Sequence, residues 1–257
     1  MTSCKFAADT FILHPSSFIL FAAAFLAGIV NSIAGGGTLI SFPSLLWIGR
    51  NAIIANATST IALWPGSLSG MLGFRRDLAT LPRRLYILIV PSLAGGIAGA
   101  MLLLHTSTKT FERLVPWLIL GATMLLAFQG VITKRIPHRW PLGLIILLQL
   151  LVAFYGGYFG AGIGILMLAA LGLIGLTDLH QMNGLKNLLA ICINGVAAVY
   201  FAASGAVIWS DAILMAIAAI AGGFSGAKLA HVLGRRFVRG FVIAVGLCMT
   251  VALFLKR

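Results

Sequence analysis

Two glycine-rich stretches inside apolar segments contain residues whose types and spacing could form a substrate-binding site. They read NSIAGGGTLISFP at residues 31–43 and FGAGIG at residues 159–164. Glycine disfavours a continuous helix, and Pro43 also removes a backbone donor. We therefore expect a broken helix in both stretches, and the N–H groups at the start of a half-helix attract anions. The candidate substrate-binding residues here are Gly35, Gly36, Gly37, Gly162 and Gly164.

Polar side chains form a second candidate group, at NATST (56–60) and NGLKN (183–187). Amides and hydroxyls can bind an oxyanion directly, and Lys186 could supply one positive charge. Two structural alternatives stay open: Lys186 could snorkel to the membrane interface, and the asparagines could bond neighbouring helices or cap their own. The candidate substrate-binding residues of this group are Asn56, Thr58, Ser59, Thr60, Asn183, Lys186 and Asn187.

Residues suited to catalysis or to metal binding are scarce. The acidic residues lie near expected loops or segment ends, so a buried carboxylate pair is missing. The five histidines show no zinc spacing. The stretch GGFSGAK (222–228) lacks the ending of a phosphate-binding loop. We therefore expect no catalytic residue, no metal site and no cofactor, and we do not predict an enzyme.

The composition indicates the elements that must position these residues. Hydrophobic residues make up 60% of the 257 residues and charged residues 9%, against about 25% charged in a soluble domain. Several segments reach the ~18 to 20 apolar residues that span a bilayer, without the alternation of a barrel strand. The net charge of +13 lies in short clusters between apolar segments, as in cytoplasmic loops, and no nucleic-acid-binding motif accompanies it. The chain is predicted to be an all-α, polytopic membrane protein without a nucleic-acid partner.

Eight apolar segments can be read along the chain, and two of them are too long for one simple span. The first and the fifth each hold about 34 residues, roughly 51 Å if fully helical, and glycines interrupt both. The alternative explanation of these glycines is close packing of helices through small residues. The segments cover about residues 16–49, 52–72, 85–104, 114–132, 141–175, 183–204, 211–227 and 238–255.

A shift of 127 residues aligns the two halves without a gap. It places Gly35 on Gly162 and Asn56 on Asn183. We therefore predict two repeats of four segments, residues 1–140 and 141–257, forming one transmembrane domain. The loop at 73–84 has four arginines, whereas its counterpart near 204–211 has no basic residue. This asymmetry predicts an inverted topology, provided that the two long segments enter and return without a net crossing.

Four stretches together resemble the sulfite exporter TauE/SafE family of bacterial membrane permeases. They read FLAGIVNSIAGGGTLISFPSLL, NATSTIALWPGSLSGMLGFRRDL, GGYFGAGIGILM and NGLKNLLAICINGVAAVYF. The resemblance covers nearly the whole chain and implies a multi-pass transporter of small anions, such as sulfite or organosulfonates, in the bacterial cytoplasmic membrane. The family motif carries over onto Gly35, Gly36, Gly37, Asn56, Gly162, Gly164, Asn183 and Lys186.

The function predicted from these observations is secondary transport of a small anion by alternate exposure of a central site. The partners are then the anionic substrate and the lipid bilayer, and a homo-oligomer stays open. An anion channel of the same architecture is the first alternative, and an intramembrane enzyme is the second. The sequence leaves the transport direction and the coupling ion undetermined.

Overall fold

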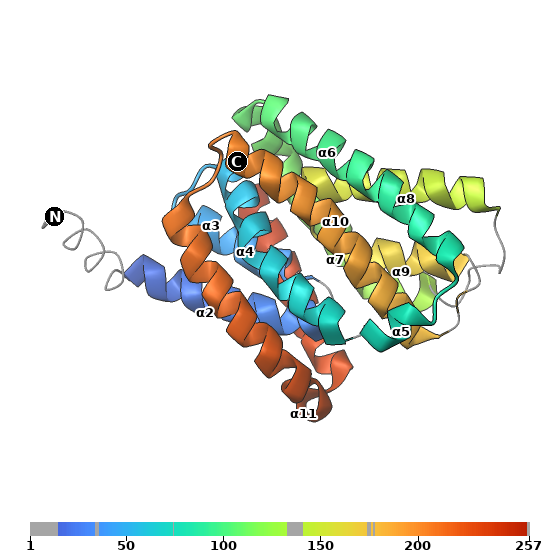
Figure 1. Ribbon diagram of the computed structural model, residues 1–257. Helices are drawn as coiled ribbons and strands as arrows, with labels where there is room; N and C mark the ends of the chain where they lie inside the picture. Colours follow the sequence, from blue (N-terminus) through green and yellow to red (C-terminus); the bar gives the residue numbers. More distant parts are fainter. Residues whose placement is uncertain are drawn as a thin grey trace, which may run out of the picture.

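The computed structural model describes residues 15–33, 36–73, 75–132, 141–173, 176 and 178–255. Over these residues it contains ten α-helices, one 3-10 helix and no strand (Figure 1), which confirms the all-α prediction. The helices are α2 (Pro15–Ile33), α3 (Thr38–Trp47), α4 (Ala52–Gly73), α5 (Arg75–Ala79), η1 (Arg83–Leu88), α6 (Ile89–His105), α7 (Thr108–Ile132), α8 (Leu142–Tyr158), α9 (Ile163–Leu173), α10 (Leu179–Ala203) and α11 (Trp209–Leu255). Gly35 and the expected junction at residues 133–140 lie outside the described residues.

Length and composition of the helices fit a membrane protein. Within the part of the chain that the structure describes, three helical segments are long and apolar enough to cross a bilayer: Arg83–His105, Thr108–Phe128 and Gln181–Ala203. Several shorter helices are also apolar, among them α3 and α9, which contain 10 and 11 residues. Helices this short reach only about 15 to 17 Å, half of a hydrocarbon core. They can therefore enter a membrane and end within it.

Polar contacts near helix ends mark two opposite ends of the bundle. At the Arg50 end, Arg50 after α3 forms an ion pair with Asp211 at the start of α11, and Asn51 donates to the hydroxyl of Thr108 at the start of α7. At the Thr80 end, the Gln181 amide donates to the Thr80 hydroxyl, which joins the start of α10 to the connection after α5. Figure 1 shows α5 far from the α3–α4 connection. Each helix can therefore be assigned a direction between these ends.

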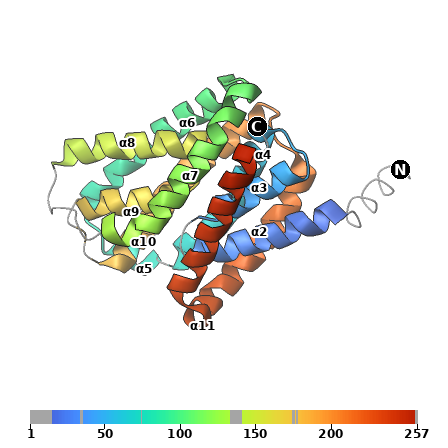
Figure 2. The same cartoon turned by 180° about the vertical axis from the view of Figure 1, so that it is seen from behind.

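Helix α11 differs from the expectation of two separate segments at 211–227 and 238–255. The structure has one continuous helical element over Trp209–Leu255, and Figures 1 and 2 show that it turns back near its middle. Its first arm packs on α2, where a Cβ added to Gly28 would collide with the Ala219 backbone. Its second arm packs on α7, where the Phe254 and Trp117 rings lie 5.2 Å apart. The turn lets one helical element cover two faces of the bundle.

Close packing holds the interior together and fixes the two interrupted segments relative to one another. Phe42 in α3, Phe111 in α7 and Phe159 after α8 are fully buried, and the rings of Phe42 and Phe159 meet edge to face at 5.4 Å. Helices α6 and α8 approach so closely that a Cβ on Gly99 or Gly157 would collide with the backbone of the facing helix. An edge-to-face ring pair such as Phe42 and Phe159 contributes about 0.5–1.5 kcal/mol beyond its buried area. The starts of α3 and α9 are thereby held within one core.

Candidate functional site

A small cavity lies where the two interrupted segments meet. Its volume is about 80 Å³, several times the ~10–15 Å³ that one water requires. Residues from α2, α4 and α10 and from both interruptions line it. None of the described residues that line it is acidic. The cavity therefore has room for a small anion and no carboxylate in its wall to repel one.

The start of α9 faces this cavity. Helix α8 ends at Tyr158 and α9 begins at Ile163. Between them, Gly160 and Gly162 have φ angles of 79° and 75°, a left-handed conformation that side chains disfavour. Gly162, Ile163 and Gly164 all line the cavity. The Ile165 N–H donates to the Gly162 carbonyl at 3.0 Å, so the turn is closed by its own backbone, and it places the positive end of the α9 dipole at the cavity.

The start of α3 faces the same cavity from another direction. Gly36 and Thr38 line the cavity, and the Gly36 carbonyl accepts from the Leu39 N–H at 3.0 Å. Gly37 precedes the helix but is not part of the lining. A Cβ on Gly37 would collide with the Ala27 carbonyl, so this glycine allows α3 to pack tightly against α2. Two half-helix N-termini therefore meet at one site.

Helix α10 contributes the charge and two amides. Lys186, Asn187 and Asn194 line the cavity along one stretch of the helix. Lys186 is only 9% exposed, and its Nζ donates to Asn183 Oδ1 at 3.3 Å. The lysine therefore lies inside the bundle rather than extending to the surface. Asn183 contacts the lysine but is not itself among the residues of the cavity wall.

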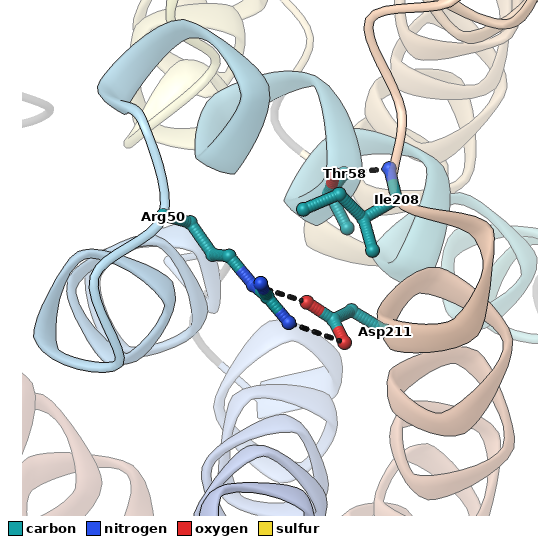
Figure 3. A network of polar contacts seen from close by, with 4 residues as sticks. All are labelled: Arg50, Thr58, Ile208 and Asp211. Carbon is teal, nitrogen blue, oxygen red and sulfur yellow. Dashed lines mark hydrogen bonds and ion pairs between the residues drawn. The ribbon is translucent and has the colours of Figure 1, made fainter. Parts of the chain in front are cut away.

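The polar residues of the NATST stretch bond to protein and do not line the cavity. Asn56 Nδ2 donates to the Tyr158 carbonyl at 3.1 Å, which satisfies a backbone acceptor at the end of α8. Thr58 accepts from the Ile208 N–H at 3.2 Å, beside the Arg50–Asp211 ion pair in Figure 3. The last two residues of the stretch also bond within the protein: Ser59 to the Ser41 hydroxyl at 2.7 Å, and Thr60 to the Asn56 carbonyl at 2.9 Å. Asn56, Thr58 and Ser59 therefore link α4 to neighbouring segments, whereas Thr60 bonds within α4.

Besides Thr38, three polar residues in the cavity wall were not candidates from the sequence. They are Asn31 in α2, Ser67 in α4 and Asn194 in α10, and the Asn31 amide lies 3.5 Å from the Ser67 hydroxyl. A signal for them was present: Asn31 opens the first glycine-rich stretch, and Ser67 and Asn194 are 127 residues apart. A search of the 127-residue register for positions that are polar in both halves would have found Ser67 and Asn194.

Comparison with known proteins gives one consistent result. The sequence profile of the family described as sulfite exporter TauE/SafE matches residues 20–253. A probable membrane transporter protein of Haemophilus influenzae is 28% identical over 236 residues, covering 90% of this chain and 92% of the relative. The probable membrane transporter protein YfcA of Escherichia coli K12 is 28% identical, and the match covers 91% of this chain and 88% of the relative. The probable membrane transporter protein ORF9 of a Sinorhizobium species is also 28% identical, over 91% of this chain and 90% of the relative. No solved structure matches the chain.

Proposed function

Because the chain belongs to the sulfite exporter TauE/SafE family of membrane transporters, we propose that it is a secondary transporter of a small anion that binds in the central cavity. One observation carries the proposal: the starts of α3 and α9 and the side chain of Lys186 line one cavity. Each half-helix start is equivalent to roughly half a positive charge, so together with the lysine the site presents about two positive charges. Such a site favours an anion of one or two negative charges.

The chemistry of the wall favours an oxyanion. The side-chain amides of Asn31, Asn187 and Asn194 can donate hydrogen bonds, and the two helix starts add the positive ends of their dipoles. Oxyanions carry several strong acceptors, and charge-assisted bonds from Lys186 are about twice as strong as neutral ones. Together with the description of the family, this donor set supports a sulfur oxyanion such as sulfite, or an organosulfonate, as the substrate.

We further propose that residues 1–140 and 141–257 are inverted repeats of one transmembrane domain. Positions 127 residues apart line the same cavity in three cases: Gly36 with Ile163, Leu63 with Ala190, and Ser67 with Asn194. The Trp64 indole also donates to the Ile191 carbonyl at 3.2 Å, again across 127 residues. Contacts between equivalent positions are expected where a pseudo-two-fold axis passes between the repeats.

The directions of the half-helices support alternating access. Helix α3 runs from the cavity to the Arg50 end. Helix α9 runs from the cavity away toward the start of α10, which lies at the Thr80 end. Two segments that enter from opposite ends and meet at a central site are typical of transporters whose halves rock around bound substrate. The exposed Arg76, Arg83 and Arg84 lie near the Thr80 end, so the positive-inside rule makes this end cytoplasmic in a bacterial inner membrane.

The proposal can be tested on the purified protein. Sulfite, sulfate, thiosulfate, organosulfonates and carboxylates are added separately while thermal unfolding is followed, because a ligand at 100 times its dissociation constant stabilises the bound state by about 2.7 kcal/mol. Anions that stabilise the protein are then used in uptake assays with proteoliposomes. We expect saturable uptake and exchange of internal for external anion. Flux that does not saturate would support a channel, and the absence of stabilisation by every anion would contradict an anion site.

A further inference from the structure

A second and much larger hollow lies at the Arg50 end, away from the central cavity. It is a cleft of about 1010 Å³ bordered by the α3–α4 connection, the first turns of α7 and the last turn of α11. Its wall has two chemically different parts, one formed by charged and polar side chains and one by apolar side chains. A small anion would use only the first part.

The polar part of the cleft is cationic. Of the described residues, Arg50, Lys109 and Arg113 line it together with one acid, Glu112. The buried Asp211 pairs with Arg50 at 2.8 Å, and the three cations and two acids among these described residues sum to one net positive charge. Lys109 lies in the first turn of α7, where the helix dipole disfavours a cation. An anion in the cleft would therefore relieve an unfavourable arrangement as well as neutralise the excess charge.

The apolar part of the cleft is formed by Leu46, Leu114, Trp117 and Leu253. The Trp117 side chain is 59% exposed and Leu114 is 40% exposed, although both are large apolar residues. The Trp117 ring packs edge to face against Phe254, which fixes its orientation. Tryptophan is enriched at the level of lipid headgroups, where its ring contacts acyl chains and its N–H contacts polar groups.

We propose that this cleft binds one anionic phospholipid, with its phosphodiester at Lys109 and Arg113 and an acyl chain along Leu114 and Trp117. Charge complementarity identifies the class of lipid: one net positive charge matches a headgroup with a single negative charge, such as phosphatidylglycerol. The apolar half distinguishes this occupant from a free anion, because it has no role in binding inorganic phosphate or substrate. The site is independent of the transport function proposed above.

The test uses the full-length protein, purified in detergent and stripped of lipid. Dioctanoyl-phosphatidylglycerol, dioctanoyl-phosphatidylcholine and the headgroup alone, glycerophosphoglycerol, are titrated separately, and bound molecules are counted by native mass spectrometry. We expect one phosphatidylglycerol to bind more tightly than either comparison ligand. Each of Lys109→Gln and Arg113→Gln should weaken it about five-fold, and the double variant about 25-fold, since each cation near a lipid surface contributes about 1 kcal/mol.

The control is Arg76→Gln, which removes an exposed cation near the Thr80 end and should leave the dissociation constant unchanged. Thermal unfolding of each lipid-free variant establishes that it is folded, and the two single variants can be read independently of each other. Equal binding of phosphatidylcholine would overturn the proposal, as would an equal loss in Arg76→Gln. Equally tight binding of glycerophosphoglycerol would also overturn it and would identify a small-anion site instead.

Discussion

Lys186→Gln is the substitution that tests the anion site most directly. The Lys186 side chain lines the cavity and is 9% exposed, and its neighbour Asn183, which accepts its hydrogen bond at 3.3 Å, is neutral. Its positive charge therefore lies at the cavity wall, where it attracts an anion in the cavity. Glutamine nearly preserves the length of the side chain and its ability to donate to Asn183, but removes the charge. A hydrogen bond to a charged group contributes about 1.5–3 kcal/mol, so affinity should fall roughly 10- to 150-fold.

The assay measures the sulfite concentration for half-maximal uptake in proteoliposomes that contain equal amounts of protein. Arg76→Gln is the matched control, because it removes a cation that is exposed and outside the cavity. Lys186→Arg should retain more affinity than Lys186→Gln, because it keeps the charge, although its planar guanidinium is wider than an ammonium. Thermal unfolding without anion separates binding from folding. An unchanged half-saturating concentration in Lys186→Gln would remove the lysine from the site and leave only a structural role.

Three further predictions concern the backbone, the amides and the topology. Gly162→Ala should lower the unfolding temperature and uptake, because alanine at φ 75° costs roughly 1–2 kcal/mol. The control Gly143→Ala should lower neither, since a Cβ there would meet no atom within 4 Å. Asn194→Ala should weaken substrate binding roughly 2- to 10-fold in the same uptake assay, the effect of one neutral hydrogen bond of about 0.5–1.5 kcal/mol, with little change in unfolding temperature. In a background without native cysteines, Ser204→Cys and Arg84→Cys, both at exposed positions, should be labelled from opposite sides of the membrane, and labelling from one side would refute the inverted topology.

The sequence was informative where a residue type conflicts with its surroundings. Glycine runs and a lysine inside apolar segments have few structural explanations in a bilayer, and the structure places Gly36, Gly162, Gly164, Lys186 and Asn187 around one cavity. The all-helical fold followed from composition in the same way. These inferences depend on what a residue is and not on which neighbour it contacts, so they could be made before the packing was known.

The direction in which each polar side chain points could not be predicted. Successive residues on a helix differ by about 100°, so the rotation of α4 determines whether Thr58 and Ser59 face the cavity or another helix. Packing turns both toward protein partners, Ile208 and Ser41. The same rotation brings Ser67 into the cavity wall. Rotation depends on contacts distant in sequence, which spacing within one segment does not encode.

The cavity carries its lysine on only one of the two halves, and this asymmetry has a consequence for the proposed transport cycle. In the 127-residue register Ser59 occupies the position of Lys186, and its hydroxyl bonds to Ser41 outside the cavity wall. The starts of α3 and α9 therefore contribute comparable partial charges, whereas among the described residues of the wall only Lys186 in α10 contributes a full charge. Because electrostatic attraction falls with distance, an anion in the cavity is held mainly by the second half of the chain. In the proposed cycle we therefore expect the contacts to α3 to break first when the halves rock apart, and the anion to leave after its bond to Lys186 is exchanged for water.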